Sequence, residues 1–240
     1  GAMLFALQAD TCEPWLLKEA YAAADDLGVK LQLHAAQGLF EVHSIMQRSG
    51  KLPVGYLDDV GVLGPRTLLA HALFLSGHPW LPYRLEGDLE RLADSGAGVV
   101  HCPQAFARRG LALSSFDRYR KAGIRVAIGT DTFPRDMVQE LRWASYLCKL
   151  EERDFAAAEA WSVFSAATDV AADLLDRPDL GRLAPGTLAD FLTISFDAYR
   201  IGPVYDPVSA LVHAGTGEDV RDVYVAGEPR VRVGRVLGVD

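Results

Sequence analysis

The chain has 240 residues, half of them hydrophobic and 23% charged, which is the composition of an ordinary globular protein. Its formal net charge of −8 and the lack of any cluster of basic residues argue against nucleic acid as a partner. No apolar run approaches the ~20 residues that a membrane-spanning helix needs, so no membrane partner is expected either.

The cysteines and the first residues lead to two further expectations. Cys12, Cys102 and Cys148 are widely spaced and fit neither a disulfide framework nor a CxxC metal site, which favours a cytoplasmic location. Residues 1–3 (GAM) have the form of a cleaved tag remnant before a start methionine, and we leave them out of the fold.

Five short apolar segments have the pattern of buried strands, and they begin near residues 4, 30, 68, 98 and 125. Apolar residues at helical spacing predict helices at residues 14–27, 38–48, 88–95, 116–122, 136–150 and 154–175. The stretch from residue 51 to 66 is punctuated by Pro and Gly and carries no predicted element. Alternation of strand and helix indicates an α/β fold, with a parallel sheet flanked by helices.

The pattern changes after residue 180. GRLAPGTLADFLTIS, DVRDVYVAGEP and RVRVGRVLGV are short β segments broken by turns, without long helices between them. We therefore predict an α/β part over residues 4–180 and a small β structure over residues 181–240.

One stretch, RVAIGTDTFP at residues 125–134, combines a buried strand with an acidic residue just beyond it. Asp131 has two interpretations. It is either the N-cap of the next helix, since Asp is a preferred cap, or a catalytic or metal-binding carboxylate. α/β barrels place their chemistry at the C-terminal ends of strands, which supports the second interpretation.

Each of the three strands before this one carries a histidine near its C-terminal end: His34, His71 and His101. A single histidine on an apolar strand is usually structural. Three in succession, followed by Asp131 at the same end of the next strand, are hard to explain by packing alone. Imidazole and carboxylate together suit Zn²⁺ or Fe²⁺, so we expect a divalent metal as cofactor.

These motifs resemble the amidohydrolase superfamily, in particular its cytosine deaminase, guanine deaminase and triazine hydrolase branch. LQLHAAQ with His34, LLAHALFLS with His71, VVHCP with His101 and GTD with Asp131 are similar to the family's fifth to eighth barrel strands. DLGRLAPGTLADFLTIS and VYVAGEPRVRVGRV resemble its return into a small β-sandwich. The resemblance implies about the last five strands of a (β/α)8 barrel, followed by a C-terminal β-sandwich portion.

The resemblance also implies roles for single residues. His34 and Asp131 would bind the metal, and Asp131 would also act as a base toward the attacking water. His71 would contact the substrate and the reaction intermediate, and His101 would line the substrate pocket. The expected substrate is a small molecule.

Two features depart from the family pattern. The His-x-His pair of the family's first strand does not occur in this sequence. We therefore expect a truncated chain that lacks three strands, with a naturally short protein as the alternative. Gln37 stands where the deaminases commonly have a proton-shuttling Glu. A glutamine amide can bind substrate by a hydrogen bond but cannot exchange a proton at neutral pH.

The predicted function is metal-dependent hydrolysis of C–N or C–halogen bonds in heteroaromatic amines or cyclic amidines. The alternative is a catalytically inert fragment or assembly subunit that pairs through exposed sheet edges. Because five parallel strands cannot close a barrel of eight, we also expect a homo-oligomer.

Overall fold

The computed structural model describes residues 2–238, so Gly1 of the expected tag remnant and the last two residues lie outside the described part. The chain divides into two compact units. The first contains the residues up to Cys102 together with Phe106–Ala127, and the second contains Pro103–Ala105 together with the residues from Ile128 onward.

The first sheet has five strands in the order of the chain: β1 (Leu4–Gln8), β2 (Leu31–Ala35), β3 (Thr67–His71), β4 (Gly98–His101) and β5 (Val126–Ile128). β1 pairs with β2, β2 with β3 and β3 with β4 in parallel, and Leu33 lies opposite Leu69, which in turn lies opposite Val99. All five strands begin within two residues of the predicted positions. The α/β fold with a parallel sheet is therefore confirmed.

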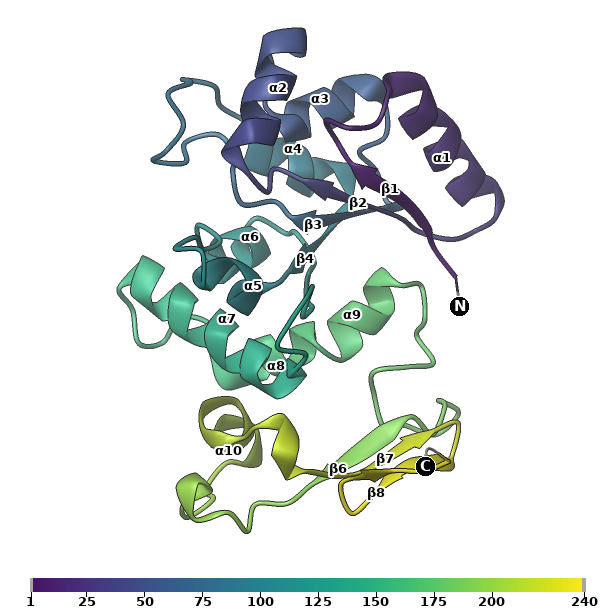
Figure 1. Ribbon diagram of the computed structural model, residues 1–240, viewed down its shortest axis with the longest axis vertical. Helices are drawn as coiled ribbons and strands as arrows, with labels where there is room; N and C mark the ends of the chain where they lie inside the picture. Colours follow the sequence, from purple (N-terminus) through teal and green to yellow (C-terminus); the bar gives the residue numbers. More distant parts are fainter. Residues whose placement is uncertain (1, 239–240) are drawn as a thin grey trace. The chain divides into compact units, whose positions relative to one another are not determined.

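Burial of this sheet increases away from β1. All five residues of β3 are buried, whereas Phe5 and Leu7 on β1 are more than half exposed. Figure 1 shows α1, α2, α3 and α4 along one side of the strands. Continuous burial of a strand is typical of a parallel sheet that is covered on both faces.

The helices of the first unit are α1 (Pro14–Asp26), α2 (Leu39–Ser49), α3 (Pro53–Val60), α4 (Asp88–Ser95) and α6 (Phe116–Lys121), while α5 (Pro103–Ala107) is cut by the division between the units. α3 was not predicted. Pro53 occupies its first turn and Gly61 ends it at φ 79°. Proline at a helix start and glycine just past its end are helix signals as well as loop signals. In this segment these residues mark the ends of a helix.

The second unit contains α7 (Met137–Glu152), α8 (Ala160–Ala166), α9 (Asp169–Leu174), β6 (Phe191–Ile194), η1 (Tyr199–Ile201), α10 (Pro207–Ala214), η2 (Gly217–Asp219), β7 (Val220–Val225), β8 (Glu228–Arg232) and β9 (Arg235–Val236). The predicted single helix over residues 154–175 is wrong, because two shorter helices occupy it. The hydroxyl of Thr168 donates to the carbonyl oxygen of Phe164 at 2.9 Å, a local bond that competes with continuation of the helix.

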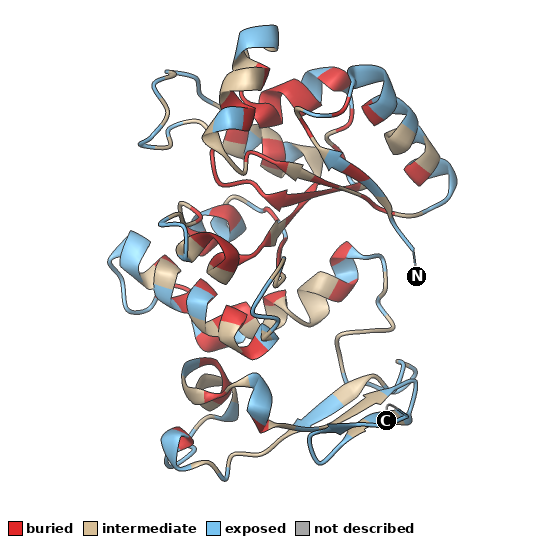
Figure 2. Ribbon diagram, in the orientation of Figure 1, coloured by how far each residue is buried: buried red, intermediate tan, exposed pale blue. Residues whose placement is uncertain are grey.

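The second sheet is antiparallel, in the order β6, β7, β8 and β9. In Figure 2 its strands are mostly tan and pale blue, whereas β2 and β3 of the first sheet are largely red. Leu192 on β6 is 49% exposed. A small β structure was predicted for this part of the chain, and the antiparallel sheet lies there, with α10 as an unpredicted helix inside it.

Among residues 2–238, no helix combines the length and the hydropathy that crossing a bilayer requires.

Candidate functional site

The predicted histidines lie where the strands of the first sheet end. His34 is the fourth residue of β2, and His71 and His101 are the last residues of β3 and β4. The register places Ala35 opposite His71. Because parallel strands all point the same way, their carboxyl ends form one edge of the sheet, where α/β proteins place their functional groups.

His34 is oriented by a backbone hydrogen bond. Its Nδ1 lies 2.6 Å from the carbonyl oxygen of Leu7 on β1. A carbonyl oxygen only accepts, so Nδ1 carries the proton and Nε2 presents its lone pair. Phe5 stands edge-on to the ring, with 5.4 Å between centroids. Metal-binding histidines are held by bonds of this kind, which set both tautomer and ring direction.

His71 is buried and chemically unsatisfied. It is 1% exposed, and its Nδ1 has no hydrogen-bond partner among residues 2–238. The ring stacks on His34 at 5.2 Å between centroids, with 6° between the planes. Burial, with smaller contributions from the charges of His34, His101 and Arg109, lowers the pKa of His71 to about 3. The ring is therefore neutral at pH 7 and available to bind a metal ion or a substrate.

The backbone that carries His71 is strained. His71 has φ 84° and Ala72 has φ 49°, a region that non-glycine residues rarely adopt at a cost of about 1–3 kcal/mol each. The hydroxyl of Tyr119 donates to the carbonyl oxygen of Ala72 at 2.5 Å, and the Ala72 N–H donates to Ala35 at 3.0 Å. Strain that is held in place by such bonds is typical of functional sites.

Asp131 follows β5 by three residues and is exposed, with φ 55°. It does not cap the next helix. The N-cap of α7 is Asp136, whose carboxylate accepts from the N–H of Gln139 at 3.1 Å. The N-cap interpretation of Asp131 is therefore wrong, which leaves the interpretation as a ligand or base.

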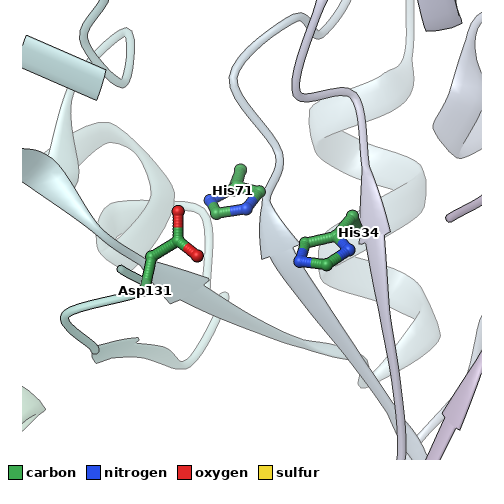
Figure 3. Close-up of side chains that lie close together, drawn as sticks. All are labelled: His34, His71 and Asp131. Carbon is green, nitrogen blue, oxygen red and sulfur yellow. The ribbon is translucent and has the colours of Figure 1, made fainter. Parts of the chain in front are cut away.

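Figure 3 shows the side chains of His34, His71 and Asp131, which form a group that could hold a metal ion. One ligand atom of each lies within 4.8 Å of the others. Two imidazoles and a carboxylate match the donor set of catalytic zinc sites. The unpartnered Nδ1 of buried His71 is the observation that fits a bound ion or substrate, because a buried nitrogen normally has a partner.

His101 and Gln37, the other two predicted residues, belong to the first unit. His101 is 3% exposed, and burial lowers its pKa to about 3. Gln37 lies two residues beyond β2, and its side-chain amide donates to Oε1 of Gln8 at 2.5 Å. Gln8 is the register partner of His34. Gln37 is thus tied to the end of β1, next to the strand that carries His34.

Several buried carboxylates on helices were not predicted, among them Glu41, Asp88 and Glu140. Glu41 and Asp88 accept hydrogen bonds from backbone N–H groups in loops that follow strands, and Glu140 accepts one from a backbone N–H of α5. The donors are Ala36 and Gln37 for Glu41, Ser76 for Asp88 and Gln104 for Glu140. The available signal was an acidic residue within an otherwise apolar helical face, as in LFEV at residues 39–42.

The chain is similar to known proteins over most of its length. The model of the amidohydrolase family matches residues 8–230. A 5'-deoxyadenosine deaminase from Methanopyrus kandleri is 32% identical over 234 residues, which cover 96% of this chain and 52% of the relative. A 5-methylthioadenosine/S-adenosylhomocysteine deaminase from Halobacterium salinarum is 36% identical over 228 residues, covering 93% and 51%. The chain spans about half the length of the curated relatives it matches.

The chain is also similar to solved structures. An adenosine deaminase from Xanthomonas campestris with bound zinc superposes with a TM-score of 0.91 at 26% identity, over 99% of this chain and 53% of that one. A variant of atrazine chlorohydrolase from Arthrobacter aurescens TC1, complexed with zinc and atraton, has a TM-score of 0.84 at 27% identity, covering 99% and 52%.

Proposed function

The chain belongs to the amidohydrolase family, and we propose that it catalyses the hydrolysis of a C–N bond on an aminated heteroaromatic ring. The observation that carries the proposal is the group His34, His71 and Asp131 at the ends of strands. Imidazole and carboxylate donors suit a divalent ion, and the zinc in the Xanthomonas campestris neighbour favours Zn²⁺.

The proposed roles follow from the donors. His34, through Nε2, and Asp131 would hold the ion, which supplies Lewis-acid activation of water when bound. Asp131 takes a proton from the attacking water, whose oxygen forms a bond to the ring carbon. Neutral His71 contacts the substrate and stabilises the charge that develops. The leaving nitrogen takes up the proton that Asp131 accepted, the C–N bond breaks and ammonia leaves, while the ring carbon keeps the oxygen. His101 lines the pocket.

We propose an adenine-type ring as the substrate, because the named relatives are deaminases of adenosine derivatives. Release of a halogen is the second candidate, favoured by Gln37 and by the likeness to atrazine chlorohydrolase. A chloride leaving group needs no proton, so a residue that cannot donate a proton suffices there.

The finer architecture is part of the proposal. We infer that the five-stranded sheet is a portion of a (β/α)8 barrel and the four-stranded sheet a portion of a β-sandwich, with the domain boundary near residue 181. The homo-oligomer remains a prediction, supported by exposure of 54% for Phe5 and 55% for Leu7 on β1.

The test has two independent arms. Zinc titration of the metal-stripped chain by calorimetry should give a binding signal, and His34→Ala should lose it. Ammonia release from 5'-deoxyadenosine and adenosine should depend on added zinc. Zinc binding without ammonia release would contradict the substrate class, and failure of both arms would support the inert subunit instead.

Gln37→Glu separates the two leaving groups. A carboxylate at this position restores a group that can exchange a proton, so ammonia release should rise by ~10²-fold or more and become pH-dependent. Chloride release from the 6-chloro analogue of the same nucleoside should fall. Rates on both compounds are to be measured from about pH 5 to 9, and unchanged profiles on both would place Gln37 outside the active site.

A further inference from the structure

Glu41 is a buried carboxylate in the first turn of α2, only 1% exposed. Its Oε1 accepts from the backbone N–H of Ala36 and its Oε2 from the backbone N–H of Gln37, both at 2.8 Å. Within the described residues, no lysine or arginine forms an ion pair with it. The negative charge is therefore balanced by backbone amides alone.

These two amides belong to the turn that links His34 to Gln37. Ala36 has φ 52°, a left-handed conformation that costs a non-glycine residue free energy and needs support from its surroundings. The Glu41 carboxylate supplies that support with one charge-assisted bond at the strained residue and a second at the next one. The direction in which Gln37 leaves β2 is thus set by Glu41.

Gln37 then continues a chain of polar contacts. Its side-chain amide donates to Gln8, and the amide of Gln8 donates to Asp10 at 2.7 Å. The N–H of Gln37 is held by Glu41 at one end and its side chain by Gln8 at the other. Both restraints act on a residue three positions from His34.

We propose that Glu41 is a positioning residue: its carboxylate fixes the turn at Ala36 and Gln37, and so orients the Gln37 amide beside His34 for substrate binding. The significance for catalysis rests on the proposed function, whereas the positioning itself does not.

The electrostatics of Glu41 place its titration near neutral pH. Burial raises its pKa to about 7 against the opposing effect of the hydrogen bonds from Gln37, Ala36 and Gly38, and the charge of Asp10 raises it further. Retaining a carboxyl group at such a position is costly. Only the ionised form accepts fully with both oxygens, whereas an amide of the same size presents one acceptor and one donor.

Asp88 provides a matched control in the same unit. It is 3% exposed on α4, and its Oδ2 accepts from the N–H of Ser76 at 2.9 Å, in the loop after β3. Asp88→Asn therefore removes charge from a similar buried acceptor without touching the turn at Gln37.

The experiment is residue-resolved amide exchange on the whole chain, in wild type, Glu41→Gln and Asp88→Asn. Glu41→Gln should accelerate exchange at Ala36 and Gln37 by about 10- to 100-fold, the effect of losing a hydrogen bond to a charged group. The amide of Leu33 in β2 should keep its rate. In wild type, the amide proton shifts of Ala36 and Gln37 should titrate near neutral pH, and in Glu41→Gln this titration should vanish. Asp88→Asn should leave both amides unchanged.

Two outcomes would overturn the proposal. In the first, the amides of Ala36 and Gln37 exchange in Glu41→Gln at their wild-type rates. In the second, amide exchange accelerates equally throughout β2. Neither readout requires catalysis. Where activity is present, Glu41→Gln should raise KM as Gln37→Ala does, and the double variant should be no worse than either single one. Zinc affinity should stay at the wild-type value in Glu41→Gln. A wild-type protein that binds no zinc would therefore count against the proposed function and not against the positioning role of Glu41.

Discussion

The parallel sheet of the first unit and the antiparallel sheet of the second use polar groups in opposite ways. In the first, every residue of β3 is buried, and the polar groups stand at strand ends, where His71 lacks a hydrogen-bond partner for Nδ1. In the second, charged side chains lie within the strands and pair with one another. Asp222 on β7, for example, forms an ion pair with Arg232 on β8.

The difference indicates where each sheet can carry chemistry. A neutral, buried and unpartnered imidazole retains binding capacity that a ligand can use. A carboxylate that already accepts bonds from Val233 and Thr193, as Asp222 does, has its capacity satisfied within the fold. We therefore expect the first sheet to determine activity and the second to contribute mainly to structure.

The largest effect is expected for Asp131→Asn. The amide has nearly the same shape but loses the charge and the base, so the hydrolysis rate should fall by ~10²–10⁴-fold or more. Asp222→Asn is the matched control, and it should keep the wild-type rate. Rates are measured on zinc-loaded protein. Full activity in Asp131→Asn, or an equal loss in both variants, would contradict the contrast between the sheets.

The next largest effect is expected from the difference in core burial between the two sheets. Leu69 on β3 is fully buried, and Leu69→Ala should cost about 2–5 kcal/mol of unfolding free energy, because it leaves a cavity. Leu192 on β6 is 49% exposed, and Leu192→Ala should cost less than ~1 kcal/mol. Urea unfolding followed by amide exchange in each unit measures both values. Equal costs would show that burial does not distinguish the sheets.

The pH dependence should have opposite signs for two carboxyl groups. The pKa of Glu41 is raised from 4.5 to about 7, so the folded state binds more protons than the unfolded state in this range. Stability should therefore fall by up to about 3 kcal/mol as pH rises from 4.5 to 7. Glu41→Gln should flatten this part of the profile.

The pKa of Asp219 in the second unit is shifted in the opposite direction. Burial alone would raise its pKa, but hydrogen bonds from Thr216 and the charge of Arg200 lower it below its usual range. Its contribution is present at neutral pH and lost as pH falls below the ordinary aspartate pKa. Asp219→Asn should weaken acid sensitivity in amide exchange of the second unit. A profile of the same sign for both variants would contradict these assignments.

The smallest effect is expected where the two units use the same local device. Ser115 accepts from the N–H of Arg118 at 3.0 Å as the N-cap of α6, as Asp136 does for α7. Ser115→Ala should cost about 1 kcal/mol, and Ser115→Asn should be close to neutral. Thermal unfolding measures both. A loss as large as that of Leu69→Ala would mean that Ser115 acts through core packing instead.

Much of this arrangement could be predicted from the sequence because it depends on neighbours along the chain. Short apolar segments located all five parallel strands, and each strand-end residue of the candidate site was named from its place after such a segment. Helix boundaries near Pro53, Gly61 and Thr168 were not predicted, since the same residues serve loops and helix ends alike.

Contacts between residues far apart in the chain, and the loss of water around them, could not be predicted from the sequence. His34 is oriented by Leu7, 27 residues away, and His71 becomes neutral because burial disfavours its charged form. Glu41 was missed for the same reason. Its partners are backbone N–H groups, which every residue except proline carries, so no side-chain pattern identifies them. Desolvation by the surrounding core gives that carboxylate its role, and it arises only when the chain is packed.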